Sequence, residues 1–259
     1  MKVNDVELII EGAGPKVIVM IHGWPDTYRL WDPQVDALKA GYRCVRFTLP
    51  GFDRSAPRRA YSFAELLEIL RRVVEETSPG KRVILLLHDW GCFFGYQFAM
   101  RHPELVERIV GVDIGDAGSR ENRAELGFRG MTIVLVYQLW LAAAWKIGGR
   151  LGDGMARWMA RTMRCPTDPR TIGAHMGYPY AMRWLGAGGG LHGVKVFAPQ
   201  CPMLFMYGKR KPVMFHSRRW AERVAAQPGS RVIEFDTGHW IMVQRPRELN
   251  EALLGWLAS

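Results

Sequence analysis

The stretch from Val83 to Met100 constrains the fold more than any other part of the chain. It begins with five consecutive apolar residues, Val83–Leu87, which have the length and composition of a strand buried on both faces of a sheet. The tetrapeptide His88-Asp89-Trp90-Gly91 follows as a sharp turn, and the residues after it have a helical composition. A strand, a tight turn and a helix in this order raise the residue at the tip above the sheet, beside the first backbone N–H groups of the helix. Here the tip residue is Asp89.

Asp89 has two interpretations when only these residues are considered. Asp is a common N-cap residue, and an aspartate after a strand often does no more than cap the next helix. Asp also tolerates a positive φ better than most residues, so it fits a strained tip from which a side chain reaches into a site. The rest of the chain has to decide between them.

Strands and helices alternate on both sides of this stretch. Strands are predicted at residues 6–10, 16–21, 42–48, 107–113, 203–207 and 231–235, and helices after Asp32-Pro33, from Ser62 to about Glu76, at 217–227 and from Pro246. Ser62 and Glu65 form a capping-box pattern, and Asp32 followed by Pro33 is typical of a helix start. The alternation predicts an α/β fold with a mostly parallel sheet covered by helices on both faces.

The alternation stops between about Asp116 and Val196, where helix-like segments occur without a convincing strand. We expect an inserted helical cap at residues 116–196, and a core domain formed by residues 1–115 and 197–259. Within the cap, the apolar run Met131–Trp145 is shorter than the roughly 20 residues that a membrane span needs, so no stable span is expected. It is interpreted as a buried cap helix, as a helix lining an apolar substrate pocket, or as both, and contact with a membrane surface is a third option.

The composition excludes several classes of protein. The net charge of +10 could indicate a nucleic-acid partner, but the basic residues are dispersed and no nucleic-acid motif occurs, so none is expected. The four cysteines have no paired spacing, which argues against disulfides or a zinc site. The start of the chain lacks the apolar segment of a signal peptide, and we therefore expect a cytoplasmic protein.

Three sequence motifs fall at the carboxyl ends of predicted parallel strands, where open α/β sheets gather their sites. They are His22-Gly23-Trp24-Pro25, His88-Asp89-Trp90-Gly91 and Gly238-His239-Trp240. A nucleophile early in the chain and a histidine late is the order found in α/β-hydrolases. With Asp89 at a tip and a glycine before His239, a general base is favoured over a packed or surface histidine.

In these motifs the chain resembles, over essentially its whole length, the α/β-hydrolases of the epoxide hydrolase and haloalkane dehalogenase group. In that group an aspartate attacks carbon and forms an alkyl-enzyme ester, which water activated by a histidine then hydrolyses, without a metal or cofactor. The resemblance implies that Asp89 is the nucleophile and His239 the base. It also implies that the backbone N–H groups of Trp24 and Trp90 form the oxyanion hole.

The chain departs from the pattern of this group in two places. Leu87 stands where a small residue is usual, two positions before the nucleophile, and is expected to crowd the turn. The acid usual after the seventh strand is missing, because no Asp or Glu occurs between residues 201 and 221. A base without an acid partner is poorly oriented. Some dehalogenases of the group carry their acid after the preceding strand, which points to Asp113, with Asp116 in reserve.

Epoxide opening needs a proton donor, and the epoxide hydrolases of this group use two cap tyrosines. Tyr137, within Val136-Tyr137-Gln138-Leu139-Trp140, resembles the first of them. Tyr180 is the better-placed candidate for the second, and Tyr178 is the next. The remaining cap aromatics Trp140 and Trp184, together with Tyr178, are expected to line the substrate pocket.

The resemblance favours an epoxide hydrolase that converts a hydrophobic epoxide and water into a vicinal diol. A haloalkane dehalogenase is the alternative, with the indole N–H groups of Trp90 and of Trp140, Trp145 or Trp184 around the halide. A fluoroacetate-type dehalogenase would need arginines after the nucleophile, and none is present. A non-catalytic ligand-binding protein on the same scaffold is a further alternative, supported by the missing acid. The substrate and the oligomeric state, monomer or homodimer, are left open.

Overall fold

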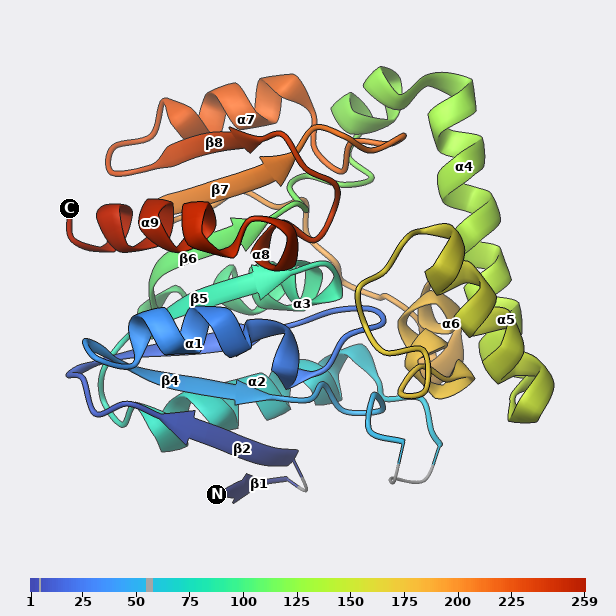
Figure 1. Ribbon diagram of the computed structural model, residues 1–259, viewed down its shortest axis with the longest axis horizontal. Helices are drawn as coiled ribbons and strands as arrows, with labels where there is room; N and C mark the ends of the chain where they lie inside the picture. Colours follow the sequence, from blue (N-terminus) through green and yellow to red (C-terminus); the bar gives the residue numbers. More distant parts are fainter. Residues whose placement is uncertain (5, 55–57) are drawn as a thin grey trace.

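The computed structural model describes residues 1–4, 6–54 and 58–259, and its centre is an eight-stranded sheet (Figure 1). Across the sheet the strands are β1 (Lys2–Val3), β2 (Val6–Glu11), β4 (Tyr42–Phe47), β3 (Lys16–Ile21), β5 (Val83–His88), β6 (Val106–Val112), β7 (Met203–Gly208) and β8 (Arg231–Phe235). The pairs from β4 to β8 are parallel, and β2 pairs antiparallel with β1 and β4. The predicted α/β fold with a mostly parallel sheet is confirmed.

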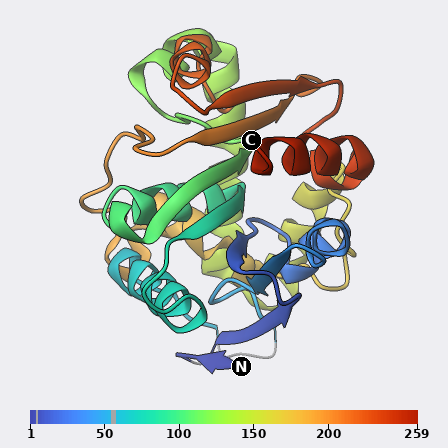
Figure 2. The same ribbon diagram turned by 90° about the vertical axis from the view of Figure 1, so that its left-hand side faces the viewer.

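Helices cover both faces of the sheet, as Figure 2 shows. One apolar cluster joins the sheet to α2 (Phe63–Thr77), α3 (Trp90–Ala99) and α7 (Arg218–Ala225). The other joins it to α1 (Asp32–Leu38), α8 (Ile241–Gln244) and α9 (Pro246–Leu257). Because β5 lies between the two clusters, all its residues are buried, as its unbroken apolar sequence predicted.

Two predicted helix starts have different outcomes. The capping box at Ser62 is confirmed, with the Ser62 hydroxyl accepting a hydrogen bond from the Glu65 N–H at 3.1 Å. The helix start at Asp32-Pro33 is confirmed, because α1 begins at Asp32, but a 3-10 turn (Tyr28–Trp31) leads directly into it and Trp31, not Asp32, occupies the cap position. The Asp32 carboxylate instead forms an ion pair with Arg46 of β4.

Between β6 and β7 the chain leaves the sheet and forms helices beside the carboxyl ends of the strands (Figure 1). They are α4 (Arg120–Ile147), α5 (Gly149–Thr162) and α6 (Tyr178–Leu185), with short 3-10 turns at Ala174–Gly177 and Ala187–Gly189. A further 3-10 turn, Pro103–Leu105, precedes β6. Residues 116–196, all of which the structure describes, form no strand.

Helix α4 is the least buried of the apolar segments. By length and composition alone it could cross a membrane, although only 17% of its apolar window is buried. Its backbone breaks at Gly127, where φ is 60°. The expectation of a buried helix at residues 131–145 is wrong for one side, since Leu135, Val136 and Leu139 are exposed.

Candidate active site

Asp89 stands at the tip between β5 and α3 with a φ of 52° and a ψ of −123°. Its side chain makes no capping hydrogen bond to α3, so the simple N-cap interpretation is wrong. Instead, its Oδ1 accepts a hydrogen bond from the backbone N–H of Trp24 at 2.7 Å. The strained backbone therefore directs the carboxylate toward the loop after β3.

Leu87 is accommodated in the turn by a glycine of the following helix. A Cβ atom at Gly95 would lie 2.6 Å from both terminal methyl groups of Leu87, a distance too short for carbon atoms. Because Gly95 has no side chain, there is room in the turn for Leu87 where a small residue is usual. The predicted crowding is relieved from the helix side.

His239 follows β8 and lies between two carboxylates. Its Nδ1 is 2.5 Å from Oδ2 of Asp113, which follows β6, and its Nε2 is 3.6 Å from Oδ2 of Asp89. The first distance is a short hydrogen bond, and the second is an ion-pair distance slightly beyond a hydrogen bond. Because all three residues follow parallel strands, the sheet brings positions 89, 113 and 239 to one edge.

The charges of this cluster set the protonation of His239. Burial by itself would lower the pKa of His239, but the charges and hydrogen bonds of Asp113 and Asp89 raise it to about 9. Burial would likewise raise the pKa of Asp89, yet His239 and the Trp90 N–H hold it below its usual value. At neutral pH the unliganded site therefore contains an imidazolium between two carboxylates.

Asp113 has a second cationic partner in Lys211. Asp113 is fully buried, and its Oδ1 accepts hydrogen bonds from the Gly208 N–H at 3.0 Å and from the Lys211 ammonium. The ammonium also donates to the Gly208 carbonyl at 2.7 Å. Burial would raise the pKa of Asp113, but Lys211 and His239 hold it below its usual value. The loop after β7, which carries no acid, thus contributes a cation to the acid from β6.

Asp116 has a different environment. Its Oδ1 accepts from the backbone N–H of Ser217 at 2.6 Å, and its Oδ2 accepts from the hydroxyl groups of Ser217 and Ser119. Ser217 precedes α7 and caps it. Asp116 therefore joins the start of α7 to the start of α4, and Asp113 is the carboxylate that contacts His239.

Buried polar groups behind the site support the Trp24 loop and His239. His22 Nε2 accepts a hydrogen bond from the Leu49 N–H at 2.9 Å, so its Nδ1 carries the proton and donates to the Gly23 carbonyl at 2.9 Å. The ring of His88 lies 4.4 Å from that of His239 and contacts the His239 carbonyl through Nε2 at 3.2 Å. Burial lowers the pKa of His22 to about 4 and of His88 to about 3, so both are neutral.

Asp26 connects the site to the segment that follows α5. It is buried and accepts hydrogen bonds from the Trp240 indole at 3.0 Å and from the Thr167 hydroxyl. Burial raises the pKa of Asp26 to about 6. No role for Asp26, His22, His88 or Lys211 was predicted from the sequence. The first three lie in or beside the strand-end motifs, which was the available signal.

Two tyrosines reach the same region from the helices between β6 and β7. The ring of Tyr180 (α6) packs edge-on against Trp90 at 5.2 Å, Trp24 at 6.1 Å and Tyr137 (α4) at 6.1 Å. Burial, and then the charge of Asp89, raise the pKa of Tyr180, and both also act to raise that of Tyr137. Both phenols are therefore protonated and within the electrostatic field of Asp89.

Tyr178 and the two predicted pocket tryptophans have partners elsewhere. Tyr178 is fully buried against Phe52 and Tyr61, with ring centroids 5.7 and 5.9 Å apart. The Trp140 indole donates to the Met155 carbonyl at 3.0 Å. The Trp184 indole donates to Gln138 Oε1 at 2.9 Å, and Gln138 donates in turn to the Tyr137 hydroxyl at 3.1 Å.

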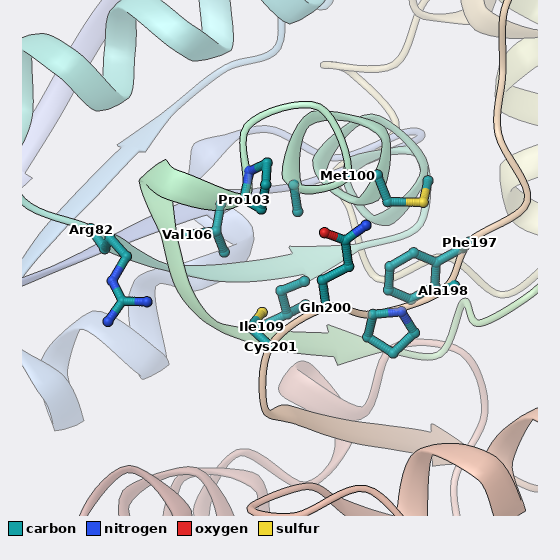
Figure 3. Close-up of a pocket in the computed structure, with 11 residues that line it drawn as sticks. Arg82, Met100, Pro103, Val106, Ile109, Phe197, Ala198, Gln200 and Cys201 are labelled. Atoms are coloured by element: carbon teal, nitrogen blue, oxygen red, sulfur yellow. The ribbon is translucent and has the colours of Figure 1, made fainter.

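A small cavity of about 60 Å³, drawn in Figure 3, is lined in part by Ala99 and Met100 and so lies at the end of α3 opposite Asp89. Its lining includes Arg82, Met100, Phe197 and Cys201. It lacks a pair of acidic and basic groups suited to acid–base chemistry. Among the described residues, no group of three or more His, Cys, Asp or Glu side chains is arranged to hold a metal ion.

Comparison with known proteins places this geometry in a family. The model of the alpha/beta hydrolase family matches residues 18–252. Over 100 residues the chain is 37% identical to the probable oxidoreductase EphD of Mycobacterium tuberculosis, a match covering 38% of this chain and 17% of that protein. It is 32% identical over 129 residues to epoxide hydrolase 1 of Caenorhabditis elegans, covering 48% of this chain and 32% of that protein. The chain thus matches less than a third of the length of each.

Solved structures extend the likeness to nearly the whole chain. An epoxide hydrolase of Bacillus megaterium in complex with an inhibitor superposes with a TM-score of 0.72 at 18% identity, over 98% of this chain and 97% of that chain. A thermophilic esterase of Thermogutta terrifontis superposes with a TM-score of 0.70 at 17% identity, over 98% and 93%. At this identity the likeness shows the fold alone.

Proposed function

The chain belongs to the α/β-hydrolase family, and we propose that it is an epoxide hydrolase that converts a hydrophobic epoxide and water into a vicinal diol. One observation carries the proposal. The Asp89 carboxylate faces the Trp24 N–H on one oxygen and His239 on the other, and two protonated tyrosines stand within its field. A carboxylate nucleophile with phenol donors suits the opening of a strained ether ring.

In the first step Asp89 Oδ2 attacks an epoxide carbon and the carbon–oxygen bond of the ring breaks. The departing oxygen takes a proton from the hydroxyl of Tyr137 or Tyr180, which gives an alkyl ester on Asp89 and a free alcohol. Asp89 Oδ1 remains on the Trp24 N–H and becomes the carbonyl oxygen of the ester. Phenols with a raised pKa suit this role because they are fully protonated at neutral pH.

In the second step neutral His239 removes a proton from water, and the hydroxide attacks the ester carbonyl. The oxyanion forms at Oδ1, where the N–H groups of Trp24 and Trp90 stabilise it. Collapse of the intermediate breaks the ester bond, and the departing alkoxide takes the proton from His239 and leaves as the diol. The carboxyl proton that remains on Asp89 then passes to His239, which regenerates the carboxylate and the resting imidazolium. Asp113 orients His239 through Nδ1 and stabilises the imidazolium that forms.

The charges favour this order of steps. In the unliganded site two carboxylates, Asp89 and Asp113, balance two cations, Lys211 and protonated His239. Esterification neutralises Asp89, which leaves one carboxylate beside two cations. His239 then loses a proton more readily to the tyrosinate left by ring opening, and the resulting neutral imidazole is the form that activates water.

We extend the proposal to the rest of the chain. Residues 116–196 act as a cap over a core formed by residues 1–115 and 197–259, and the cap supplies both tyrosines. Catalysis needs no metal or cofactor, and the enzyme works in the cytoplasm.

Three contacts weigh against the alternatives. A haloalkane dehalogenase needs indole N–H groups around the halide, and those of Trp140 and Trp184 already donate to Met155 and Gln138, whereas that of Trp145 is buried without a hydrogen-bond partner among the described residues. A non-catalytic role was favoured by the missing acid after β7, and Asp113 now lies against His239 from the neighbouring strand.

The test is an intact mass of the His239→Gln variant after incubation with a hydrophobic terminal epoxide such as styrene oxide. Without its base the ester forms but is not hydrolysed, so a mass gain equal to the whole epoxide is expected, and Asp89→Asn abolishes it. His102→Gln is the matched control, because His102 lies beyond the far end of α3 and should leave turnover intact. A gain of alkyl without halogen, seen only with a haloalkane, contradicts the proposal.

A further inference from the structure

The outer side of α4 carries a stripe of exposed apolar residues that the proposed chemistry does not use. The residues of this stripe recur at spacings of three and four, which places them on one side of the helix. The most exposed of them is Phe128, at 90%. The stripe consists of Phe128, Met131, Leu135, Val136 and Leu139. Tyr137 lies about half a turn away, on the side that faces Tyr180. The helix therefore presents its tyrosine to the site and its apolar stripe to the outside. In Figure 1 α4 lies at the right-hand edge of the molecule.

Two tryptophans widen this stripe into a face. Trp158 of α5 is half exposed and packs against Trp140 with ring centroids 4.9 Å apart, on one flank of α4. Trp184 of α6 is also exposed and is hydrogen-bonded to Gln138, on the other flank. We call Phe128, Met131, Leu135, Val136, Leu139, Trp158 and Trp184 the outer apolar face. Tryptophans at the borders of an apolar surface are typical of segments that rest at a membrane–water interface.

Basic residues surround the outer apolar face. Residues 116–196 contain 11 Lys and Arg against 5 Asp and Glu, a net charge of +6 out of +10 for the chain. No charged residue occurs between Arg129 and Lys146. Arg129, Lys146, Arg150 and Arg161 are exposed, and none of these four forms an ion pair with another described residue. The face is thus apolar in the middle and cationic at its ends.

We propose that the outer apolar face docks on an anionic lipid bilayer, with α4 lying in the plane of the interface. Apolar side chains enter the boundary of the acyl chains while Lys and Arg side chains meet the lipid phosphates. A second copy of the chain fits less well, because a two-fold interface would place these cationic ends close to one another. A transmembrane orientation is excluded, since the inner side of α4 packs on α5 and α6.

Docking in this orientation would place the helix that carries Tyr137 directly on the lipid. A lipid-soluble epoxide could then enter from the bilayer without crossing water. This consequence rests on the proposed function, whereas docking itself does not. The two are tested separately, because binding to lipid is measured without substrate.

The experiment is flotation of the full-length protein with vesicles of phosphatidylcholine alone or mixed with phosphatidylglycerol. We expect binding to the anionic vesicles, weaker binding to the neutral ones, and loss of binding as salt is raised. Phe128→Ser combined with Leu135→Gln should lower the partition coefficient by about tenfold or more, because two apolar side chains no longer enter the lipid. Arg150→Glu combined with Arg161→Glu should weaken binding to the vesicles that contain phosphatidylglycerol and leave binding to the neutral vesicles unchanged.

The matched control is Val243→Gln combined with Leu254→Gln. It removes two exposed apolar side chains from α8 and α9. In Figure 1 α9 lies across the molecule from α4, and α8 lies between them. It should bind vesicles like the wild type, and thermal melts verify that all variants fold. Failure of the wild type to bind anionic vesicles overturns the proposal. If sizing then shows a dimer that the Phe128/Leu135 variant dissociates, the face is an interface between copies instead.

Discussion

Replacing Lys211 with Met should shift the pH dependence of ester hydrolysis to higher pH. Lys211 is nearly buried, and its ammonium contacts the same carboxylate, Asp113, that holds His239. Methionine keeps most of the apolar stem and removes the charge. The positive charge that opposes protonation of His239 is then lost, so the pKa of His239 rises both before and after esterification of Asp89.

The size of the shift follows from the geometry. One carboxylate and two short hydrogen bonds separate the Lys211 ammonium from the His239 ring, on the order of 6 Å. At an effective dielectric constant of about 20, the repulsion between two unit charges at that distance is about 3 kcal/mol, or about 2 pKa units. Relaxation and water entry after the substitution reduce this, so a shift of about 1 to 2 units is expected.

The direction of the pKa shift of His239 determines what the assay should detect. The base form of His239 is neutral and is lost as pH falls below its pKa, so the rate of hydrolysis rises with pH. In Lys211→Met the rise of the hydrolysis rate with pH shifts to higher pH, so hydrolysis at pH 7 slows by about 10- to 100-fold. The ester on Asp89 should therefore accumulate at pH 7 and disappear after a jump to pH 10. Rapid-quench mass spectrometry during a single turnover of styrene oxide measures the accumulation of the ester at pH 7 and its loss after the pH jump.

Lys211→Arg is the matched control, because it restores the cation and should return the profile toward that of the wild type. A lower rate with an unchanged pH profile in Lys211→Met would mean that Lys211 only supports the loop. A shift to lower pH would refute the electrostatic argument outright.

Three further outcomes are expected. Gly95→Ala should lower the free energy of unfolding by about 1–3 kcal/mol in denaturant titrations, because the new Cβ meets Leu87, and Leu87→Ala should rescue part of the loss. Tyr137→Phe and Tyr180→Phe should each slow formation of the ester by about 100-fold without slowing its hydrolysis, and equal slowing of both steps in pre-steady-state kinetics would argue against proton donation. Asp113→Asn should lower turnover by about 1,000-fold or more, because the amide no longer supports the imidazolium, and near-normal turnover would remove Asp113 from the mechanism.

Much of the fold was predictable because its signals are local. An unbroken apolar run indicates a strand buried on both faces, and Ser62 with Glu65 indicates a helix start, since in each case the interacting groups lie close in the sequence. The three strand-end motifs could be placed at one edge of the sheet, because the carboxyl ends of parallel strands all lie on one side. Asp89 and His239 could therefore be predicted from the sequence as residues of one site.

The choice between neighbouring candidates needed the tertiary structure. Asp113 and Asp116 are three residues apart, and only the backbone after β6 sends the first to His239 and the second to Ser217. Tyr178 and Tyr180 are two residues apart on α6 and so point to different sides, one to Phe52 and the other to Trp90.

The sequence by itself determined the order of strands and helices and the residue types at the strand ends, because these depend on short-range periodicity and turn chemistry. The tertiary structure alone decided which groups are partners. Lys211 meets Asp113 across 98 residues of chain, and Gly95 makes room for Leu87 across a packing contact. It also decided that one side of α4 is exposed, because an apolar residue has the same composition whether it faces a core or the outside. Long-range pairing, and the exposure of one side of an apolar helix, depend on how the chain folds, and no local pattern encodes them.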